Sequence, residues 1–344
     1  MPEYGIIRIL TELYMISIIY PIYNVEAFLA KSIESILSQN YSDFEIIAIN
    51  DGSTDRSYEI ALKYASQDNR IKLFNQPNKG VSETRAIAIS RSIGEYLVFV
   101  DSDDCLPRNA LANLLNNIGN VDIVVGSYLE NYNNQSIRRD LFNLQELTSR
   151  EYLNLILSEK IQWGLWAKLY KKSLFIGTVV PPFKLGEDVS LLVQAIVQSN
   201  RVKIINDCVY NYNYRIDSAV NRKVTSDIVD VYLFRIWISD YLKKCYLLSK
   251  KEIDDIETFI VKGYIKCLLR GGAPYLLNEK YHLNIITSIY SNLLWWERLI
   301  LKVKDHRIML DIVVAVLNLL LKFKQKVSLL IANFTSNNTY RHNK

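Results

Sequence analysis

Three carboxylates follow directly on a short apolar run near the middle of the first half of the chain. The run 96–100 has the composition of a buried strand, and Asp101, Asp103 and Asp104 come immediately after it. Three anions at one strand tip are unfavourable unless a cation lies beside them. Carboxylate oxygens suit Mg²⁺ or Mn²⁺, which usually bridge protein to phosphate. The alternative is a solvated acidic turn that caps a helix starting near Pro107.

Two further polar segments could contact a nucleotide. Asp51-Gly-Ser-Thr-Asp55 follows another apolar run and combines a strand-tip Asp with a turn Gly and helix-capping residues. Asp51 could accept hydrogen bonds from a base or ribose, or the segment could be an ordinary capped turn. In Asn78-Lys-Gly-Val-Ser-Glu-Thr-Arg85, Lys79 or Arg85 could face a diphosphate. A surface helix with a salt bridge is the alternative for that segment.

A general base is expected to be a carboxylate. Glu187 and Asp188 start a predicted helix after a loop, where one of them could reach a substrate hydroxyl. Acidic residues are also favoured at helix N-termini by the helix dipole, without any catalytic role. The histidines, His282, His306 and His342, all come late in the chain, so a Ser-His-Asp triad or a histidine zinc site is not expected.

Composition describes a globular protein of more than one typical domain. The chain has 344 residues, of which 49% are hydrophobic and 22% are charged, so disorder is not expected. Its four cysteines form no Cys-x-x-Cys pair and have no zinc-site spacing, which indicates free thiols in a reducing cytoplasm. No signal peptide is expected at the N-terminus, and no apolar run reaches the length of a membrane span.

The first half alternates short apolar runs with helical patterns. Apolar strands separated by helices predict a mostly parallel sheet covered on both faces, which binds ligands outside the carboxyl ends of its strands. The polar segments described above fall at those ends. The expected strands are 15–21, 44–50, 71–75, 96–100 and 121–125, and the expected helices are 25–39, 55–66, 81–93 and 108–117.

The second half is expected to be mainly helical. Residues 131–139 are predicted to be a polar loop and 162–182 an irregular segment, with helices at 149–158 and 187–198. Further helices are predicted near 225–247, 250–270, 279–296 and 299–333. We divide the chain into an N-terminal extension (1–14), an α/β domain (15–222) and a helical C-terminal region (223–344).

Taken in order, these motifs resemble the inverting glycosyltransferases of family 2, which have the GT-A fold. The resemblance covers about residues 15–222 and implies a nucleotide-diphospho-sugar transferase domain followed by a helical region. The motifs are Ile16-Ser-Ile-Ile-Tyr-Pro21-Ile-Tyr-Asn24, Asp51-Gly-Ser-Thr-Asp55, Asn78-Lys-Gly80-Val-Ser with Arg85, Asp101-Ser-Asp103-Asp104, Trp166-Ala-Lys168-Leu-Tyr, Glu187-Asp188 and Tyr210-Asn-Tyr212-Asn-Tyr-Arg215 with Ser218.

The resemblance implies a role for individual residues. Asp101 and Asp103 match the D-x-D pair that holds Mn²⁺ or Mg²⁺ with the sugar nucleotide. Asp188 matches the catalytic base, and Glu187 would orient the base or the acceptor. Trp166 and Lys168 would border the acceptor site. The residues expected to bind the nucleotide sugar are Pro21, Tyr23, Glu26, Asp51, Ser53, Lys79, Arg85, Asp101 and Ser102.

The implied activity is metal-dependent transfer of a hexose or N-acetylhexosamine, with inversion, from a nucleotide-diphosphate sugar. UDP is the default nucleotide, and the acceptor would be a hydroxyl of a glycan or lipid-linked acceptor in bacterial surface polysaccharide synthesis, such as lipopolysaccharide or capsule. The alternatives are an inactive nucleotide-sugar-binding or scaffold protein of a glycan assembly complex, or a sugar-1-phosphate nucleotidyltransferase. The nucleotidyltransferase is disfavoured because its basic Gly-rich loop is replaced by Pro21-Ile-Tyr-Asn24.

The C-terminal segment is basic. From Arg298 to Lys344, nine Lys or Arg accompany Asp305 and Asp311, which gives roughly +7, whereas the whole chain carries +5. Together with Trp295 and the apolar stretch 308–321, this predicts peripheral attachment to an anionic cytoplasmic membrane surface. Packing of these helices on the catalytic domain or in a homodimer is the alternative. Nucleic acid is not an expected partner.

Overall fold

The protein is described from a computed structural model. The structure describes residues 15–132, 135–140, 146–181, 183–214, 226–270, 276, 292–303, 310 and 312–317. The predicted N-terminal extension, most of the predicted helix 279–296 and the basic tail from 318 onward lie outside these residues. The chain falls into two compact units, divided after residue 222, and each is described by itself.

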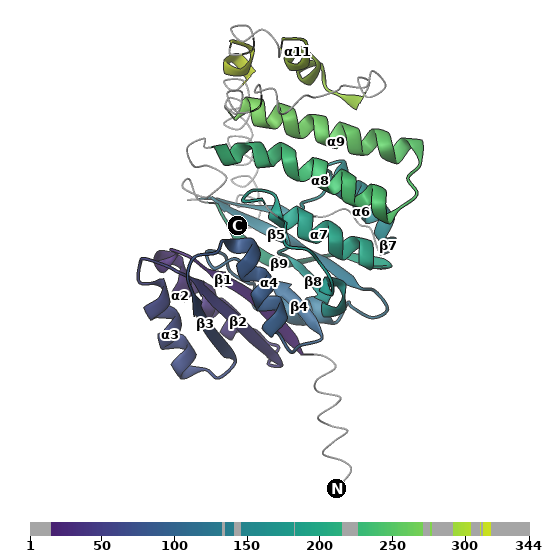
Figure 1. Ribbon diagram of the computed structural model, residues 1–344. Helices are drawn as coiled ribbons and strands as arrows, with labels where there is room; N and C mark the ends of the chain where they lie inside the picture. The colour runs from purple at the N-terminus through teal and green to yellow at the C-terminus, as the bar shows by residue number, and fades with distance from the viewer. Residues whose placement is uncertain are drawn as a thin grey trace, which may run out of the picture. The chain divides into compact units, whose positions relative to one another are not determined.

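The first unit is built on one mixed sheet flanked by helices (Figure 1). Its strand order is β3-β2-β1-β4-β8-β5-β9-β7, with β6 paired to β5. β1 is parallel to β2 and β4, β2 is parallel to β3, and β8 is antiparallel to both of its neighbours. The strands are β1 Ile16–Ile22, β2 Phe44–Asp51, β3 Ile71–Gln76, β4 Tyr96–Phe99, β5 Ile123–Tyr132, β6 Gln135–Arg139, β7 Glu146–Thr148, β8 Lys168–Lys171 and β9 Arg201–Asn213.

The apolar patterns explain why these elements form. All eight residues of β2 are buried, because helices cover both faces of this part of the sheet. In α2, Leu29, Ile33 and Ile36 recur at helical spacing and pack on the core that β1 and β2 also line. The helices of the first unit are α2 Glu26–Leu37, α3 Ser57–Gln67, α4 Val81–Arg91, α5 Ala110–Leu115, α6 Ser149–Leu157, the 3₁₀ turn η1 Lys172–Phe175 and α7 Glu187–Gln198.

Two segments differ from the sequence-based expectation. The loop predicted over 131–139 is wrong, because β5 continues to Tyr132 and pairs with β6, with Tyr132 opposite Gln135. An edge strand needs no apolar face, so its polar composition resembles that of a loop. The irregular segment 162–182 contains β8, a strand of only four residues at the centre of the sheet. The mostly parallel GT-A sheet is confirmed; β8 is an antiparallel strand at its centre, and β6 and β7 are also antiparallel to their neighbours.

The second unit is helical in its described part. It contains η2 Ser226–Val229, α8 Asp230–Cys245, α9 Lys250–Leu269 and α11 Trp295–Val303, and α8 and α9 pack side by side (Figure 1). α9 starts with a capping box made by Ser249 and Glu252. The predicted helix break between 296 and 299 is wrong, since α11 runs through it. Among the described residues, no helix combines the length and apolarity that a membrane crossing requires.

Candidate active site

The carboxyl ends of β1 and β2 carry two loops that are bonded to each other. Asn24, which has a φ of 51°, accepts a hydrogen bond from the Thr54 amide at 2.8 Å. The amide of Glu26 donates to Asp55 at 3.0 Å, and the Glu26 carboxylate accepts from the Arg56 amide at 2.9 Å. The predicted nucleotide-binding residues Pro21, Tyr23 and Glu26 therefore lie on or beside a rigid rim, with Tyr23 and Glu26 exposed.

Asp51, at the end of β2, fixes the loop before α4. Its carboxylate accepts from the backbone amides of Lys79 (2.8 Å) and Gly80 (2.9 Å) and from the Gln76 side chain (2.8 Å). Gly52 has a φ of 69°, and a Cβ there would lie 2.7 Å from the Asn78 amide nitrogen, so the close approach requires glycine. A pocket of about 400 Å³ adjoins this turn, lined by Asn50, Gly52, Ser53, Tyr58, Asn75, Gln76 and Pro77.

Arg85 joins the end of β4 to the start of α7. Its side chain is 5% exposed. Nη2 donates to Asp101 at 2.9 Å, and Nη1 donates to Glu187 at 3.1 Å and to Asp188. α4 carries the arginine inward because Thr84, Arg85 and Ala88 form its buried face. From the sequence, Lys79 or Arg85 could face a diphosphate, and a helix salt bridge was the alternative; in the structure Arg85 is enclosed by three carboxylates. It thereby brings Asp101, Glu187 and Asp188 together.

The electrostatics of this cluster show an excess of negative charge. Burial raises the pKa of Asp101 to about 6, with Asp188 and Asp103 adding to the rise and Arg85 opposing it. Burial also raises the pKa of Glu187 to about 8, and the charge of Asp188 contributes. Burial by itself would lower the pKa of Arg85, but its three carboxylate neighbours raise that pKa above its usual value. Arg85 therefore stays charged and only partly offsets the carboxylates around it.

Residues of β9 fix the turn after β4 by hydrogen bonds. The Tyr210 hydroxyl donates to Asp104 at 2.9 Å and accepts from the Asp101 amide at 3.1 Å. Asn213 donates its amide to Asp104 at 2.7 Å and its side chain to the Asp103 carbonyl at 2.8 Å. Asp104 is buried, and burial raises its pKa well above the usual value. This carboxyl group thus fixes the turn, while the side chains of Asp101 and Asp103 remain partly exposed.

The two predicted acceptor residues differ in accessibility. Trp166 is partly exposed and stacks on Tyr210 and Tyr212, with ring centroids 4.8 and 5.5 Å away. Lys168 is fully buried, and its ammonium group donates to the carbonyls of Gly164 (2.7 Å) and Trp166 (3.2 Å). Burial lowers the pKa of Lys168 to about 7. Lys168 therefore shapes the turn that presents Trp166 and offers no side-chain surface of its own.

The turn after β4 fits a divalent cation bound together with a phosphate. Within the described residues, no three His, Cys, Asp or Glu side chains converge as a complete metal site. Mg²⁺ and Mn²⁺ in nucleotide sites commonly take only one or two carboxylates and complete their shell with phosphate oxygens and water. Asp101 and Asp103 supply such a pair. Burial is the main cause of the raised pKa of Asp101 and the charges of Asp188 and Asp103 add to it, so a cation beside this carboxylate would oppose the rise.

The sequence predicted which residues lie at the strand ends, but not the hydrogen bonds and ion pairs that these residues form. It had no sign that Arg85 pairs with residues more than 100 positions later. It also gave no role to Asp104, Tyr210 or Asn213 in fixing the turn. The alternating Tyr and Asn residues at the end of β9 were the available signal, because such a pattern places successive polar side chains on alternate faces of a strand.

Comparison with known proteins identifies the class. Residues 17–174 match the model of glycosyl transferase family 2. GlyG, a glycosyltransferase of Streptococcus pneumoniae serotype 4, is 31% identical over 246 residues, which cover 64% of this chain and 79% of GlyG. GlyA of the same organism is 33% identical over 222 residues, which cover 58% of this chain but only 30% of GlyA. The chain therefore belongs to glycosyl transferase family 2, and its class of enzyme is a glycosyltransferase.

Solved structures share the GT-A fold. S. aureus TarS 1–349, crystallised in complex with UDP-GlcNAc, superimposes with a TM-score of 0.60 at 22% identity, covering 77% of this chain and 74% of that one. The mannosyltransferase PcManGT from Pyrobaculum calidifontis, in complex with GDP-Man and Mn²⁺, gives a TM-score of 0.51 at 15% identity, covering 89% and 87%. At these identities the likeness concerns the fold.

Proposed function

We propose that the protein is a metal-dependent, inverting glycosyltransferase. It would move a hexose or N-acetylhexosamine from a nucleotide-diphosphate sugar to a hydroxyl of a glycan or lipid-linked acceptor in bacterial surface polysaccharide synthesis. One observation carries the proposal: Arg85 holds the D-x-D residue Asp101 and the acidic pair Glu187–Asp188 around one guanidinium group. The donor-binding turn and the base are thereby adjacent, as a single displacement requires.

In this mechanism each residue has a defined task. Asp188 accepts the proton of the acceptor hydroxyl as its oxygen attacks the anomeric carbon, and the bond from that carbon to the diphosphate breaks on the opposite face. Arg85 orients Asp188, and Glu187 flanks the acceptor. Asp101 and Asp103 would hold Mn²⁺ or Mg²⁺, which would supply positive charge to offset the charge of the leaving diphosphate. Tyr210 keeps the turn in position through Asp104 and the Asp101 amide.

We place the nucleoside of the donor beside the ends of β1 and β2. The pocket of about 400 Å³ that contains Ser53 adjoins the fixed carboxylate of Asp51 there, and Tyr23 stands exposed on the neighbouring rim. Because Asp51 is already bonded to the loop before α4, it would act by shaping this pocket as well as by accepting from a base or ribose. UDP is the default nucleotide, and the TarS complex with UDP-GlcNAc supports this choice.

The proposal is tested with a panel of nucleotide sugars. The purified protein is mixed with UDP-, GDP-, dTDP- and ADP-sugars with and without Mn²⁺, and thermal unfolding and release of nucleoside diphosphate are measured. One donor should raise the melting temperature in a Mn²⁺-dependent way and be turned over. Donor binding without turnover under any condition would favour an inactive binding or scaffold protein, and release of pyrophosphate from a nucleoside triphosphate and a sugar phosphate would favour a nucleotidyltransferase.

We infer in addition that the second unit contacts an anionic membrane surface. On α11, Trp295 and Leu299 are exposed together with the basic residues Arg298 and Lys302, at the spacing of one helix face. Indole, apolar and basic groups on one face are typical of interfacial helices. Co-sedimentation with phosphatidylglycerol vesicles at low salt should be strong, and the Trp295→Ala/Leu299→Ala variant should lose most of it. Equal sedimentation with neutral vesicles would contradict this inference.

A further inference from the structure

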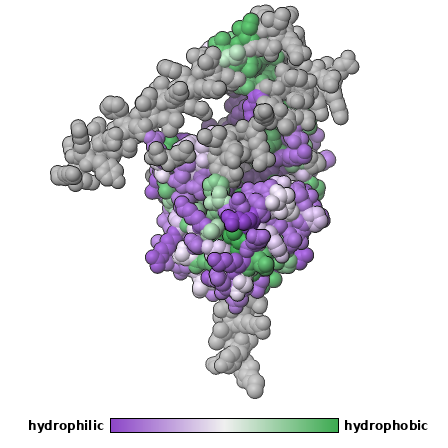
Figure 2. Space-filling model, turned by 90° about the vertical axis from the view of Figure 1, so that its left-hand side faces the viewer, coloured by the Kyte–Doolittle hydropathy of each residue, from purple (hydrophilic) through white to green (hydrophobic). Residues whose placement is uncertain are grey.

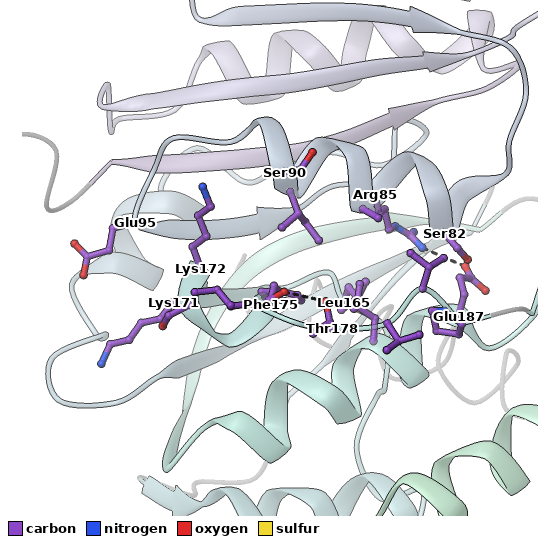
Figure 3. A pocket seen from close by; sticks show the side chains of 18 residues that line it. Ser82, Arg85, Ser90, Glu95, Leu165, Lys171, Lys172, Phe175, Thr178 and Glu187 are labelled. Carbon is purple, nitrogen blue, oxygen red and sulfur yellow. Dashed lines mark hydrogen bonds and ion pairs between the residues drawn. The ribbon is translucent and has the colours of Figure 1, made fainter.

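The first unit contains a recess next to the ion-pair cluster of Arg85. It has a volume of about 520 Å³ and lies between α4, the segment from β8 to Pro181 and the start of α7 (Figure 3). This volume lies in the range of small-molecule sites. The face seen in Figure 2 is mostly hydrophilic where the structure describes it, with smaller apolar areas. The recess, in contrast, is largely apolar, with walls formed by Ala86, Ile89, Leu165, Phe175, Val180 and Leu191.

The outer wall of the recess is fixed by hydrogen bonds. The Gln194 side chain on α7 accepts from the amide of Val179 at 2.7 Å and donates to its carbonyl at 2.9 Å. The Thr178 hydroxyl donates to the Phe175 carbonyl at 2.9 Å. The side chains of Val179 and Ile176 are nevertheless 60% and 73% exposed. Hydrogen bonds fix the backbone of this segment, while its apolar side chains stay exposed. Such a surface is suited to an apolar ligand.

The two ends of the recess differ from its walls. Figure 3 shows Arg85 and Glu187 at one end and Glu95, Lys171 and Lys172 at the other. Glu187 accepts from Arg85 at 3.1 Å, and the same nitrogen of Arg85 donates to Asp188. The inner end is thus one side chain away from the proposed base. At the far end, Lys171 donates to Asp122 and Lys172 donates to the Ser92 carbonyl, so these ammonium groups already have partners in the protein. Apolar walls that lead to Arg85 and Glu187 suit an amphiphile whose polar head lies at that inner end.

We propose that this recess binds the apolar chain of the acceptor. The inference rests on the proposed function and deepens it: the acceptor is an amphiphile whose hydrophobic portion lies along α4 and whose hydroxyl-bearing head lies beside Glu187, next to Asp188. Burial of a hydrocarbon chain supplies binding free energy in proportion to the apolar area removed from water. Glu187 and Arg85 then place the attacking hydroxyl at the base. The acceptor class is lipid-linked rather than a free glycan.

The first test measures binding of two probes that differ only in chain length. Octyl and methyl β-D-glucopyranoside are titrated below micelle formation, by isothermal calorimetry, into the full-length protein. The wild type should bind the octyl probe about tenfold more tightly or better. Ile89→Trp and Val179→Trp fill the recess from its two walls and should abolish the preference. Leu62→Trp, on α3 and 50% exposed outside the recess, is the matched control and should retain it.

Equal affinity for the two probes would overturn the proposal, and so would an octyl preference that survives both recess variants, because the chain would then bind outside the recess. A second measurement separates an acceptor site from a regulatory one. Octyl and methyl glucosides, galactosides and N-acetylglucosaminides are offered as acceptors with the active donor. At least one octyl glycoside should have a KM about tenfold below its methyl counterpart, and Ile89→Trp should remove the difference. If the octyl probes bind in the recess but no such difference exists, the acceptor assignment is wrong. A different result would contradict the proposed function itself: no release of nucleoside diphosphate from any donor.

Discussion

The phenolic oxygen of Tyr210 lies 2.9 Å from Oδ2 of Asp104, although the two residues are 106 positions apart. Burial and the neighbouring carboxylates raise the pKa of Tyr210 well above its usual value, so its hydroxyl remains a donor to Asp104. The same oxygen accepts a hydrogen bond from the backbone amide of Asp101. Strand β9 therefore sets the backbone of the turn that carries Asp101 and Asp103.

Tyr210→Phe should loosen this turn without emptying the core. Asp104 would keep its bond from Asn213, but the Asp101 amide would lose its acceptor, and the free energy of unfolding should fall by about 1–3 kcal/mol. Mn²⁺-dependent donor affinity should fall as well. Tyr64→Phe removes an exposed hydrogen bond to Glu34 and is the matched control, which should change neither quantity appreciably. Unchanged donor affinity in Tyr210→Phe would show that Tyr210 does not position the metal-binding turn.

Arg85→Ala should be among the most damaging single substitutions in the first unit. It leaves Asp101, Glu187 and Asp188 close together without their shared cation, and removal of one partner of a buried ion pair costs about 3–5 kcal/mol. Arg201→Ala breaks an exposed ion pair with Glu146 and should cost less than about 1 kcal/mol. Chemical denaturation of both variants measures the contrast. Equal losses would mean that the cluster is not a strong ion-pair network.

Lys168 should make stability depend on pH. Its folded-state pKa of about 7 lies below the usual lysine value of 10.5, so between these pH values the unfolded chain binds a proton that the folded chain does not. Stability contributed by this group therefore rises with pH across that window, by at most about 1.4 kcal/mol per pH unit. Lys168→Met should lose this slope, while also losing the bonds to Gly164 and Trp166. Denaturation at pH 7.5 and 9.5 measures it, and identical slopes in both proteins would contradict the prediction.

Asp103→Ala should weaken donor binding only where metal contributes to it. Asp103 is partly exposed beside Asp101 and supplies one of the two carboxylates that we assign to Mn²⁺. Donor titrations with and without Mn²⁺ should show the wild-type enhancement and its loss in the variant. Asp207→Ala removes a carboxylate that pairs with Asn113 on another part of the unit and should keep the enhancement. An enhancement that persists in Asp103→Ala would place the cation elsewhere.

Local patterns were sufficient to predict most of the catalytic fold. The buried strands β1, β2 and β4 are mainly apolar. Helix α7 was predicted at its observed bounds because its apolar residues recur at helical spacing. β8 was missed because four residues that begin and end with lysine give no strand signal. Its burial depends on the Lys168 ammonium group, which donates to the carbonyls of Gly164 and Trp166 in the preceding turn.

In the candidate site, too, positions could be predicted from the sequence but side-chain partners could not. Strand-end positions follow from the order of elements, so Asp51 and Asp101 could be placed from the sequence. Side-chain partners in a cluster depend on packing between distant elements. Arg85 could therefore be named as a candidate site residue from the sequence, but its enclosure by Asp101, Glu187 and Asp188 required the structure.

The central claim is that Asp188 removes the acceptor proton while the turn after β4 holds the donor. The most direct measurement compares Asp188→Asn with the wild type, using the nucleotide sugar and acceptor that give the highest turnover in Mn²⁺. The account predicts a loss of transfer of about 100-fold or more, with the dissociation constant of the donor changed by less than about threefold. Transfer at the wild-type rate by Asp188→Asn, with donor binding intact, would contradict it.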